Sequence, residues 1–201
     1  MTDQVVELRQ YTLRPGTRDT LIELFDREFL ETQEAAGMRV IGQFRDEADP
    51  DRFVWLRSFP DMEKRERALS TFYGGPVWAR HRDAARATMV DTDNAFVLRP
   101  VGDGFPLYDR PLPGSTALPE SRFLVTVHYG DEPFTDSYAD ELGYQPLACF
   151  RSEYAANTFP ALPVREGEHV FVTVERFAGA LRGGARKEEL VLRPTSRSGL
   201  R

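Results

Sequence analysis

The chain has 201 residues, of which 41% are hydrophobic, and its formal net charge is −6. This hydrophobic content is enough to build a core, which excludes a disordered chain. No long basic cluster interrupts the acidic balance, which argues against nucleic acid as a partner, because nucleic-acid binding needs a positively charged surface. The length suits one large domain or two domains of about 100 residues each.

Targeting and membrane signals are not found in the sequence. No run approaches the roughly 20 apolar residues of a membrane-spanning helix, and the first residues lack the apolar stretch of a secretory signal peptide. Cys149 is the single cysteine, which excludes an internal disulfide and a cysteine-rich zinc site. We therefore expect a soluble, cytoplasmic protein with no membrane partner.

The first hundred residues predict the order strand, helix, strand, strand, helix, strand. Period-two alternation indicates the strands, and apolar residues at helical spacing indicate the helices. The predicted elements are a strand from residue 5, a helix at 17–37, strands at 39–47 and 52–59, a helix from 61 to about 89 interrupted at 74–76, and a strand at 94–100. This order is that of a ferredoxin-like fold, in which both helices cover one face of a four-stranded antiparallel sheet.

After a stretch rich in proline and glycine, the pattern of the first half returns. The matching segments are RFLVTVHYG (122–130) with VVELRQYTL (5–13), LACFRSE (147–153) with IGQFRDE (41–47), HVFVTVERF (169–177) with RFVWLRSF (52–59), and ELVLRP (189–194) with AFVLRP (95–100). In the first match Tyr129 corresponds to Tyr11. Because all four matches occur in the same order, we interpret them as a degenerate tandem repeat. Its helices are reduced to 132–142 and about 178–188.

The sequence therefore predicts four parts of the chain. These are a first ferredoxin-like domain (1–100), a Pro/Gly-rich linker (101–121), a degenerate second ferredoxin-like repeat (122–194) and a loose tail (195–201).

Several stretches of the first half together carry a family resemblance. They are ELRQYTLRPG (7–16), the hairpin with VIGQF and FVWLRSF, KRERAL (64–69), and Trp78 followed by FVLRP. With them, residues 5–100 resemble the NIPSNAP family, a branch of the dimeric α/β-barrel superfamily. The resemblance implies an α+β fold of tandem ferredoxin-like repeats, whose antiparallel sheets face each other and close a barrel. The barrel would form within one chain as a monomer, or between two chains of a homodimer.

Strand alternation in the first half separates an apolar face from a polar face. The apolar face holds Val6, Leu8, Phe44, Val54 and Leu56, and we expect it to pack under the helices. The polar face holds Glu7, Arg9, Tyr11, Gln43, Arg45, Trp55 and Arg57. We expect this face to meet the second sheet at Val125, Val127, Tyr129, Cys149, Arg151, Thr173 and Glu175. Burial of Glu7 and Arg9 requires that both be paired, because an unpaired buried charge costs several kcal/mol.

Two interpretations of the polar face follow. In one, its charged and aromatic side chains form a lattice that joins the two sheets. In the other, they line a ligand cavity in which Arg9 and Arg57 anchor an anion beside Trp55, and Tyr11 transfers a proton.

A second place for a ligand lies between helices and sheet, where Trp78, His81 and Phe25 would line a pocket. His81 is there a further proton-transfer candidate. The three histidines lack the spacing of a metal site, so we expect no metal and no cofactor, with haem on His81 as the alternative. The run EKRER (63–67) is typical of a solvated helix face.

The sequence thus predicts an uncharacterised NIPSNAP-family protein that binds a small molecule or acts as a cofactor-independent enzyme of oxygenase or isomerase type. Superfamily relatives include cofactor-independent monooxygenases, haem-binding enzymes and dimeric binding proteins, so the fold leaves the activity open. The alternative is a non-catalytic interaction or scaffold protein whose polar face is structural. A cavity of about 300 Å³ or more beside Trp78 and His81, or inside the barrel, favours the first reading.

Overall fold

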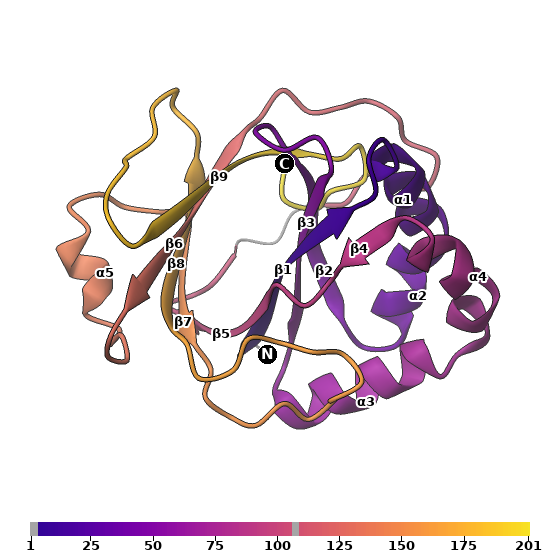
Figure 1. Cartoon of the computed structure of the whole chain (residues 1–201), viewed down its shortest axis with the longest axis horizontal. Helices are drawn as coiled ribbons and strands as arrows, with labels where there is room; N and C mark the ends of the chain where they lie inside the picture. Colours follow the sequence, from indigo (N-terminus) through magenta and orange to yellow (C-terminus); the bar gives the residue numbers. More distant parts are fainter. Residues whose placement is uncertain (1–3, 106–108) are drawn as a thin grey trace.

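The computed structural model describes residues 4–105 and 109–201. Its strands are β1 (Val5–Leu13), β2 (Arg39–Asp46), β3 (Arg52–Phe59), β4 (Met89–Asp91), β5 (Ala95–Val101), β6 (Phe123–Gly130), β7 (Ala148–Ser152), β8 (His169–Arg176) and β9 (Lys187–Pro194). Eight of them form one antiparallel sheet in the order β3-β2-β9-β6-β8-β7-β5-β1, and β1 pairs back with β3 (Figure 1). The sheet is therefore a closed barrel, built within a single chain. The short β4 pairs with β1 outside this ring.

The two halves of the barrel share one strand order. In the first half the strands lie side by side as β2-β3-β1-β5, and in the second as β7-β8-β6-β9. Each half thus places its strands in the order second, third, first, fourth. The halves join where β2 pairs with β9 and where β5 pairs with β7.

The helices are concentrated on the outer face of the first half (Figure 1). They are α1 (Arg18–Leu24), the π-helical segment η1 (Phe25–Phe29), α2 (Leu30–Ala35), α3 (Met62–Tyr73) and α4 (Pro76–Arg86), with α5 (Tyr138–Glu141) in the second half. Asp61 caps α3 by accepting the backbone N–H of Lys64 at 2.6 Å. Across the described ranges, no helix has the length and apolar character needed to cross a membrane.

The two faces of the first half are the reverse of those expected. The apolar face, including Val6 and Leu8, lines the barrel and packs with Phe123 and Val125 of the second half. The polar face, including Glu7, lies under the helices. The physical reason is that side chains from both halves fill a closed barrel, and the side chains that meet there are mostly apolar. The helix layer, in contrast, brings polar partners of its own to the charged face.

The second sheet also differs from the expected parity. Val125 and Val127 do line the barrel, and Tyr129 packs partly against the same cluster. Cys149 and Thr173 are paired neighbours on the outer face, because the adjacent pair Phe150 and Val172 belongs to the barrel core. The expected set thus mixed two faces.

This parity also changes the match between the opening strands. Tyr11 belongs to the cluster under the helices, whereas Tyr129 borders the barrel cluster. The outward residue of β6 near this point is His128, which is buried and contacts Tyr138 of α5. The sequence match of Tyr129 with Tyr11 is therefore wrong by one residue, which exchanges the faces of a strand.

The helices expected in the second half are largely replaced by loops. In place of a helix at 132–142 the structure has the four residues of α5. Residues 178–186 are not helical, and β9 begins at Lys187. Helical spacing in these short stretches was too weak to nucleate a helix, since formation of the first turn is unfavourable.

The linker contacts the rest of the chain at Phe105 and Arg110, and the tail packs against the barrel. The linker residues 106–108, including Pro106, lie outside the described residues. Just before them Phe105 is buried beside Phe150, with ring centroids 5.1 Å apart. Beyond them Arg110 donates to the carbonyl oxygen of Arg197 at 2.9 Å, which ties the linker to the tail.

The expectation of a loose tail at 195–201 is wrong. Leu200 is 1% exposed and belongs to the barrel core, and its N–H donates to the carbonyl oxygen of Ile41 at 2.8 Å. Gly199 permits this close approach, because a Cβ there would lie 2.8 Å from the same oxygen. The sequence TSRSGLR gave no sign of this, since its polar composition resembles that of a free end.

Truncation of the tail side chain tests this packing. We expect Leu200→Ala to lower the free energy of unfolding by about 2–5 kcal/mol, because it leaves a cavity in the barrel core. Urea denaturation followed by circular dichroism measures the change. The control is Leu181→Ala, whose side chain is 58% exposed and which should change stability by less than about 0.5 kcal/mol. Equal stability of the two variants would contradict a packed tail.

Candidate functional site

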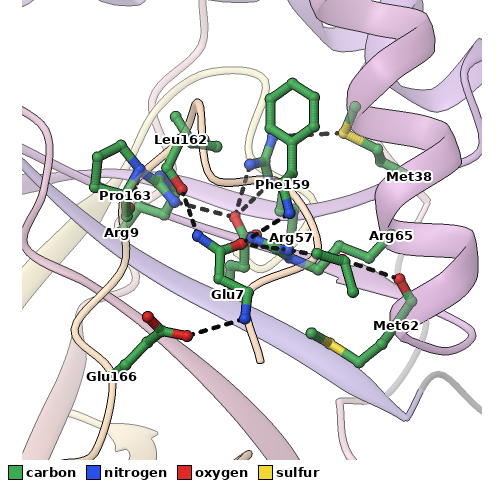
Figure 2. A network of polar contacts seen from close by, with 12 residues as sticks. Glu7, Arg9, Met38, Arg57, Met62, Arg65, Phe159, Leu162, Pro163 and Glu166 are labelled. Atoms are coloured by element: carbon green, nitrogen blue, oxygen red, sulfur yellow. Dashed lines mark hydrogen bonds and ion pairs between the residues drawn. The ribbon is translucent and has the colours of Figure 1, made fainter. Parts of the chain in front are cut away.

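A single buried carboxylate organises the polar face of the first half. The Oε2 atom of Glu7 on β1 lies 2.7 Å from Nη2 and 2.8 Å from Nε of Arg57 on β3. Arg65 of α3 donates from Nε at 2.6 Å, and Arg9 approaches at 3.3 Å. All four side chains are 0% exposed. Figure 2 shows the three guanidinium groups around Glu7.

The environment of Glu7 keeps it ionised. Burial alone raises the pKa of this carboxyl, but attraction to Arg57, Arg9 and Arg65 outweighs burial and lowers the pKa to about 2. The prediction that Glu7 and Arg9 are buried and paired is confirmed, but their cluster lies under the helices and not between two sheets. The prediction that EKRER is a solvated face is wrong at Arg65, because this residue of α3 is buried in an ion pair with Glu7 of the sheet beneath the helix.

The same arginines also bind segments far away in sequence. Arg57 donates to the side-chain oxygen of Gln33 on α2 at 3.2 Å. Arg65 donates to Asn157 at 3.0 Å, and Arg9 donates to the carbonyl oxygen of Pro163 at 3.5 Å. Residues 157–163 belong to the second half, so this cluster joins two strands, two helices and a loop of the other half. Figure 2 shows Phe159, Leu162 and Pro163 of this loop beside the arginines.

A cavity of about 590 Å³ opens above this cluster, between the sheet and its helices. Most of the residues that surround it are aromatic or aliphatic. They are Tyr11, Leu21, Phe25, Phe29, Gln33, Trp55, Ser70, Phe72, Tyr73, Gly74, Trp78, Arg82, Arg86, Met89, Thr92, Phe159, Ala161, Leu162 and Pro163.

Aromatic rings form the floor and one wall of the cavity. Tyr11 and Trp55 lie on adjacent strands with centroids 6.0 Å apart, edge to face. The ring centroids of Phe25 and Trp55 are 4.9 Å apart, and those of Phe29 and Trp78 are 5.6 Å apart. Phe25 and Phe29 are the two ends of the π-helical segment η1. Such segments are frequent at functional sites, and here both rings lie against the cavity.

The opposite side of the cavity comes from the second half. Phe159 stacks on Tyr73 of α3 with centroids 5.7 Å apart and an interplanar angle of 21°. Leu162 and Pro163 follow in the same loop and also line the cavity. Sequence reasoning missed this contribution, because a loop rich in proline shows no periodic signal for where it packs.

The candidate residues from the sequence fall into two groups. Tyr11, Trp55 and Trp78 line the cavity, whereas Arg9 and Arg57 lie behind its floor in the ion cluster. His81 is in neither group. Its Nε2 lies 3.5 Å from Glu28, and its ring lies edge to face with Phe29 at a centroid distance of 6.4 Å.

The described residues hold no group of three histidine, cysteine or acidic side chains that could bind a metal ion. His81, the haem ligand considered from the sequence, is not among the described residues around the cavity. The side chains that do surround it suit an apolar organic molecule. Tyr11 accepts a hydrogen bond from Arg9 Nε at 3.3 Å, so its own hydroxyl proton is free to donate. Burial raises the pKa of Tyr73, which favours a neutral phenol.

Comparison with known proteins gives one family match. Residues 6–103 match the NIPSNAP family model. No curated protein matches the chain. An uncharacterised NIPSNAP-like domain protein from Burkholderia xenovorans is 27% identical, with 56% of this chain and 98% of that one covered and a TM-score of 0.48.

Two solved structures match along the whole chain. One is a candidate monooxygenase from Fusobacterium nucleatum, 9% identical, covering 98% of this chain and 96% of that one with a TM-score of 0.55. The other is a candidate monooxygenase from Lactobacillus acidophilus, 12% identical, covering 98% and 97% with a TM-score of 0.53. At these identities the likeness concerns the fold alone.

Removal of the central charge should destabilise the fold strongly. We expect Glu7→Gln to lower the free energy of unfolding by about 3–5 kcal/mol, because three buried arginines lose their carboxylate. Urea denaturation measures the loss. Glu63→Gln is the matched control on α3, since that carboxylate is 66% exposed and should contribute less than about 1 kcal/mol. A loss no larger than the control's would show that the cluster contributes little.

The stability that Glu7 provides should depend on pH. Its pKa is about 2 in the folded chain against 4.5 without the interactions, so the unfolded chain binds the proton more tightly. The contribution is therefore complete above about pH 5 and is lost as the pH falls from 4.5 through 2. Unfolding of wild type and Glu7→Gln, measured from pH 7 to pH 2, should show their difference shrinking over this range. A difference that stays constant would contradict this assignment.

Proposed function

We propose, since the chain belongs to the NIPSNAP family through residues 6–103, that it binds a small organic molecule in the cavity between the first sheet and its helices. The observation that carries the proposal is the cavity itself. Its volume of about 590 Å³ lies within the roughly 300–1,000 Å³ of ligand pockets. Protein interiors are close-packed and contain few large voids, so a cavity of this size between aromatic rings suits a ligand.

The floor of the cavity supports the same proposal. The indole N–H of Trp55 is buried and has no acceptor among the described residues. Buried donors are nearly always paired, and Trp55 lines the cavity, so a small movement of the indole would let a ligand oxygen accept this N–H. The hydroxyl group of Tyr11 adds a second donor on the same floor.

The chemistry we propose for this site is proton transfer without a cofactor, as in an enzyme of oxygenase or isomerase type. Tyr11 would donate the proton to a ligand oxygen, and the nearby guanidinium of Arg9 would stabilise negative charge on the phenol oxygen. The fold shared with the two candidate monooxygenases is compatible with this chemistry.

The second candidate function is a non-catalytic interaction or scaffold protein. The observation that favours it is the closed ion cluster around Glu7, in which Arg9 and Arg57 serve the fold. Ligand binding in the cavity separates the two candidates.

We further propose that the two halves arose as a tandem repeat of one ferredoxin-like unit. The shared strand order, β2-β3-β1-β5 and β7-β8-β6-β9, supports it. The second unit would then have lost helices and gained the loop that covers the cavity of the first.

A neutral aromatic probe tests the cavity. We expect N-phenyl-1-naphthylamine to bind the wild-type chain with a Kd on the order of micromolar, read from its fluorescence. Ala161 is exposed at the cavity edge, so Ala161→Trp should obstruct entry and weaken binding at least tenfold.

The matched control is Ala156→Trp, an exposed position of the same loop that does not border the cavity. It should bind the probe as the wild type does. Trp55→Phe should weaken the binding of 2-naphthol about threefold to tenfold, because the N–H donor is lost. Displacement of the probe measures this affinity. No binding to the wild type, or equal binding by Ala161→Trp, would favour the scaffold.

A further inference from the structure

We infer that the ligand of this cavity is an organic anion, with its apolar body against the aromatic walls and its negative group at the mouth beside Arg82 and Arg86. This inference rests on the proposed function and specifies the ligand class for the same site. It is carried by the charges around the cavity and not by the shape of the cavity.

The charged side chains around the cavity all have one sign. Of the described residues that line it, Arg82 and Arg86 are charged, and none is acidic. The chain as a whole is acidic, with a net charge of −6, so a purely cationic lining runs against the average composition. Low-dielectric walls around such a lining concentrate its field in the cavity.

The two arginines continue the aromatic wall toward solvent. Trp78, Arg82 and Arg86 are spaced i, i+4 and i+8 on α4, which puts them on one stripe of the helix. All three line the cavity. The stripe therefore changes from aromatic to cationic along the helix, and both arginines are exposed at the edge. An elongated ligand with an apolar body and an anionic end would match this sequence of environments.

Arg86 differs from most exposed arginines of the chain in lacking a carboxylate partner. Arg67 pairs with Glu63, and Arg193 pairs with Glu47. Within the described ranges, Arg86 forms no hydrogen bond or ion pair, and Arg82 has only Asp83 at 3.5 Å, in a pair that is largely solvated. The mouth thus holds positive charge that the protein itself does not neutralise.

The layer behind the floor adds to this field. Three arginines and one glutamate make up the ion cluster, so its formal charge is +3 − 1 = +2. Arg9 in this layer is one hydrogen bond, 3.3 Å, from the hydroxyl group of Tyr11 on the cavity floor. Burial reduces the screening of this excess charge, so it favours an anion in the cavity and opposes a cation.

Two fluorescent probes with the same ring system test the inference. 8-Anilinonaphthalene-1-sulfonate carries one sulfonate that N-phenyl-1-naphthylamine lacks. We expect the double variant Arg82→Gln/Arg86→Gln to bind the sulfonate probe about tenfold more weakly than the wild type, which corresponds to about 1.4 kcal/mol. Its affinity for the neutral probe should stay within about twofold of the wild type. Raising the salt from 50 to 500 mM should weaken only the sulfonate probe.

The matched control is Arg80→Gln, an exposed arginine of α4 that is not part of the cavity lining. It should leave both probes within about twofold of the wild type. If the neutral probe binds and Ala161→Trp blocks it, but the double variant binds the sulfonate probe as tightly as the wild type, the anion inference is overturned and the cavity remains a binding site. If the neutral probe does not bind the wild type, the proposed function fails and the inference fails with it.

Discussion

The ion cluster of Glu7 with Arg9, Arg57 and Arg65 is the interaction on which the rest of the structure depends. One carboxylate fixes two strands and a helix at once, because each arginine approaches it from a different element. The arginines then use their remaining N–H groups on α2 and on the 157–163 loop of the second half. If one partner moved away, a buried charge would be left unpaired at a high cost in free energy, so the elements cannot shift independently.

Closure of the barrel explains why the charged face lies where it does. Eight strands in a ring enclose a volume that only side chains fill, and both halves supply apolar residues such as Leu8 and Val125 to it. The outward face must then be covered by something else. In the first half helices cover it and leave an aromatic cavity, whereas the second half uses a short helix and loops. The cavity of about 590 Å³ thus lies on the side that the helices of the first half cover.

Much of the first half could be predicted from its sequence. The alternation of Glu7 and Leu8 separated two faces correctly, and Asp61 and the break before Pro76 marked helix ends that the structure has. Tyr11, Trp55 and Trp78 were singled out, and they meet at one cavity. The direction of each face could not be predicted, because alternation states which residues share a face and not what covers it.

The sequence by itself determined the family resemblance of the first half, the order of the eight barrel strands, and the need for Glu7 to be paired. The strand order follows from local periodicity, and the pairing follows from the cost of a buried charge. Only the tertiary structure decided that Arg65 is its partner, that Phe159 covers the cavity, and that Leu200 returns to the barrel core. Each of these contacts joins residues more than 50 positions apart. Their formation depends on how the closed barrel brings its two halves together, and no local pattern along the chain predicts contacts between residues so far apart in sequence.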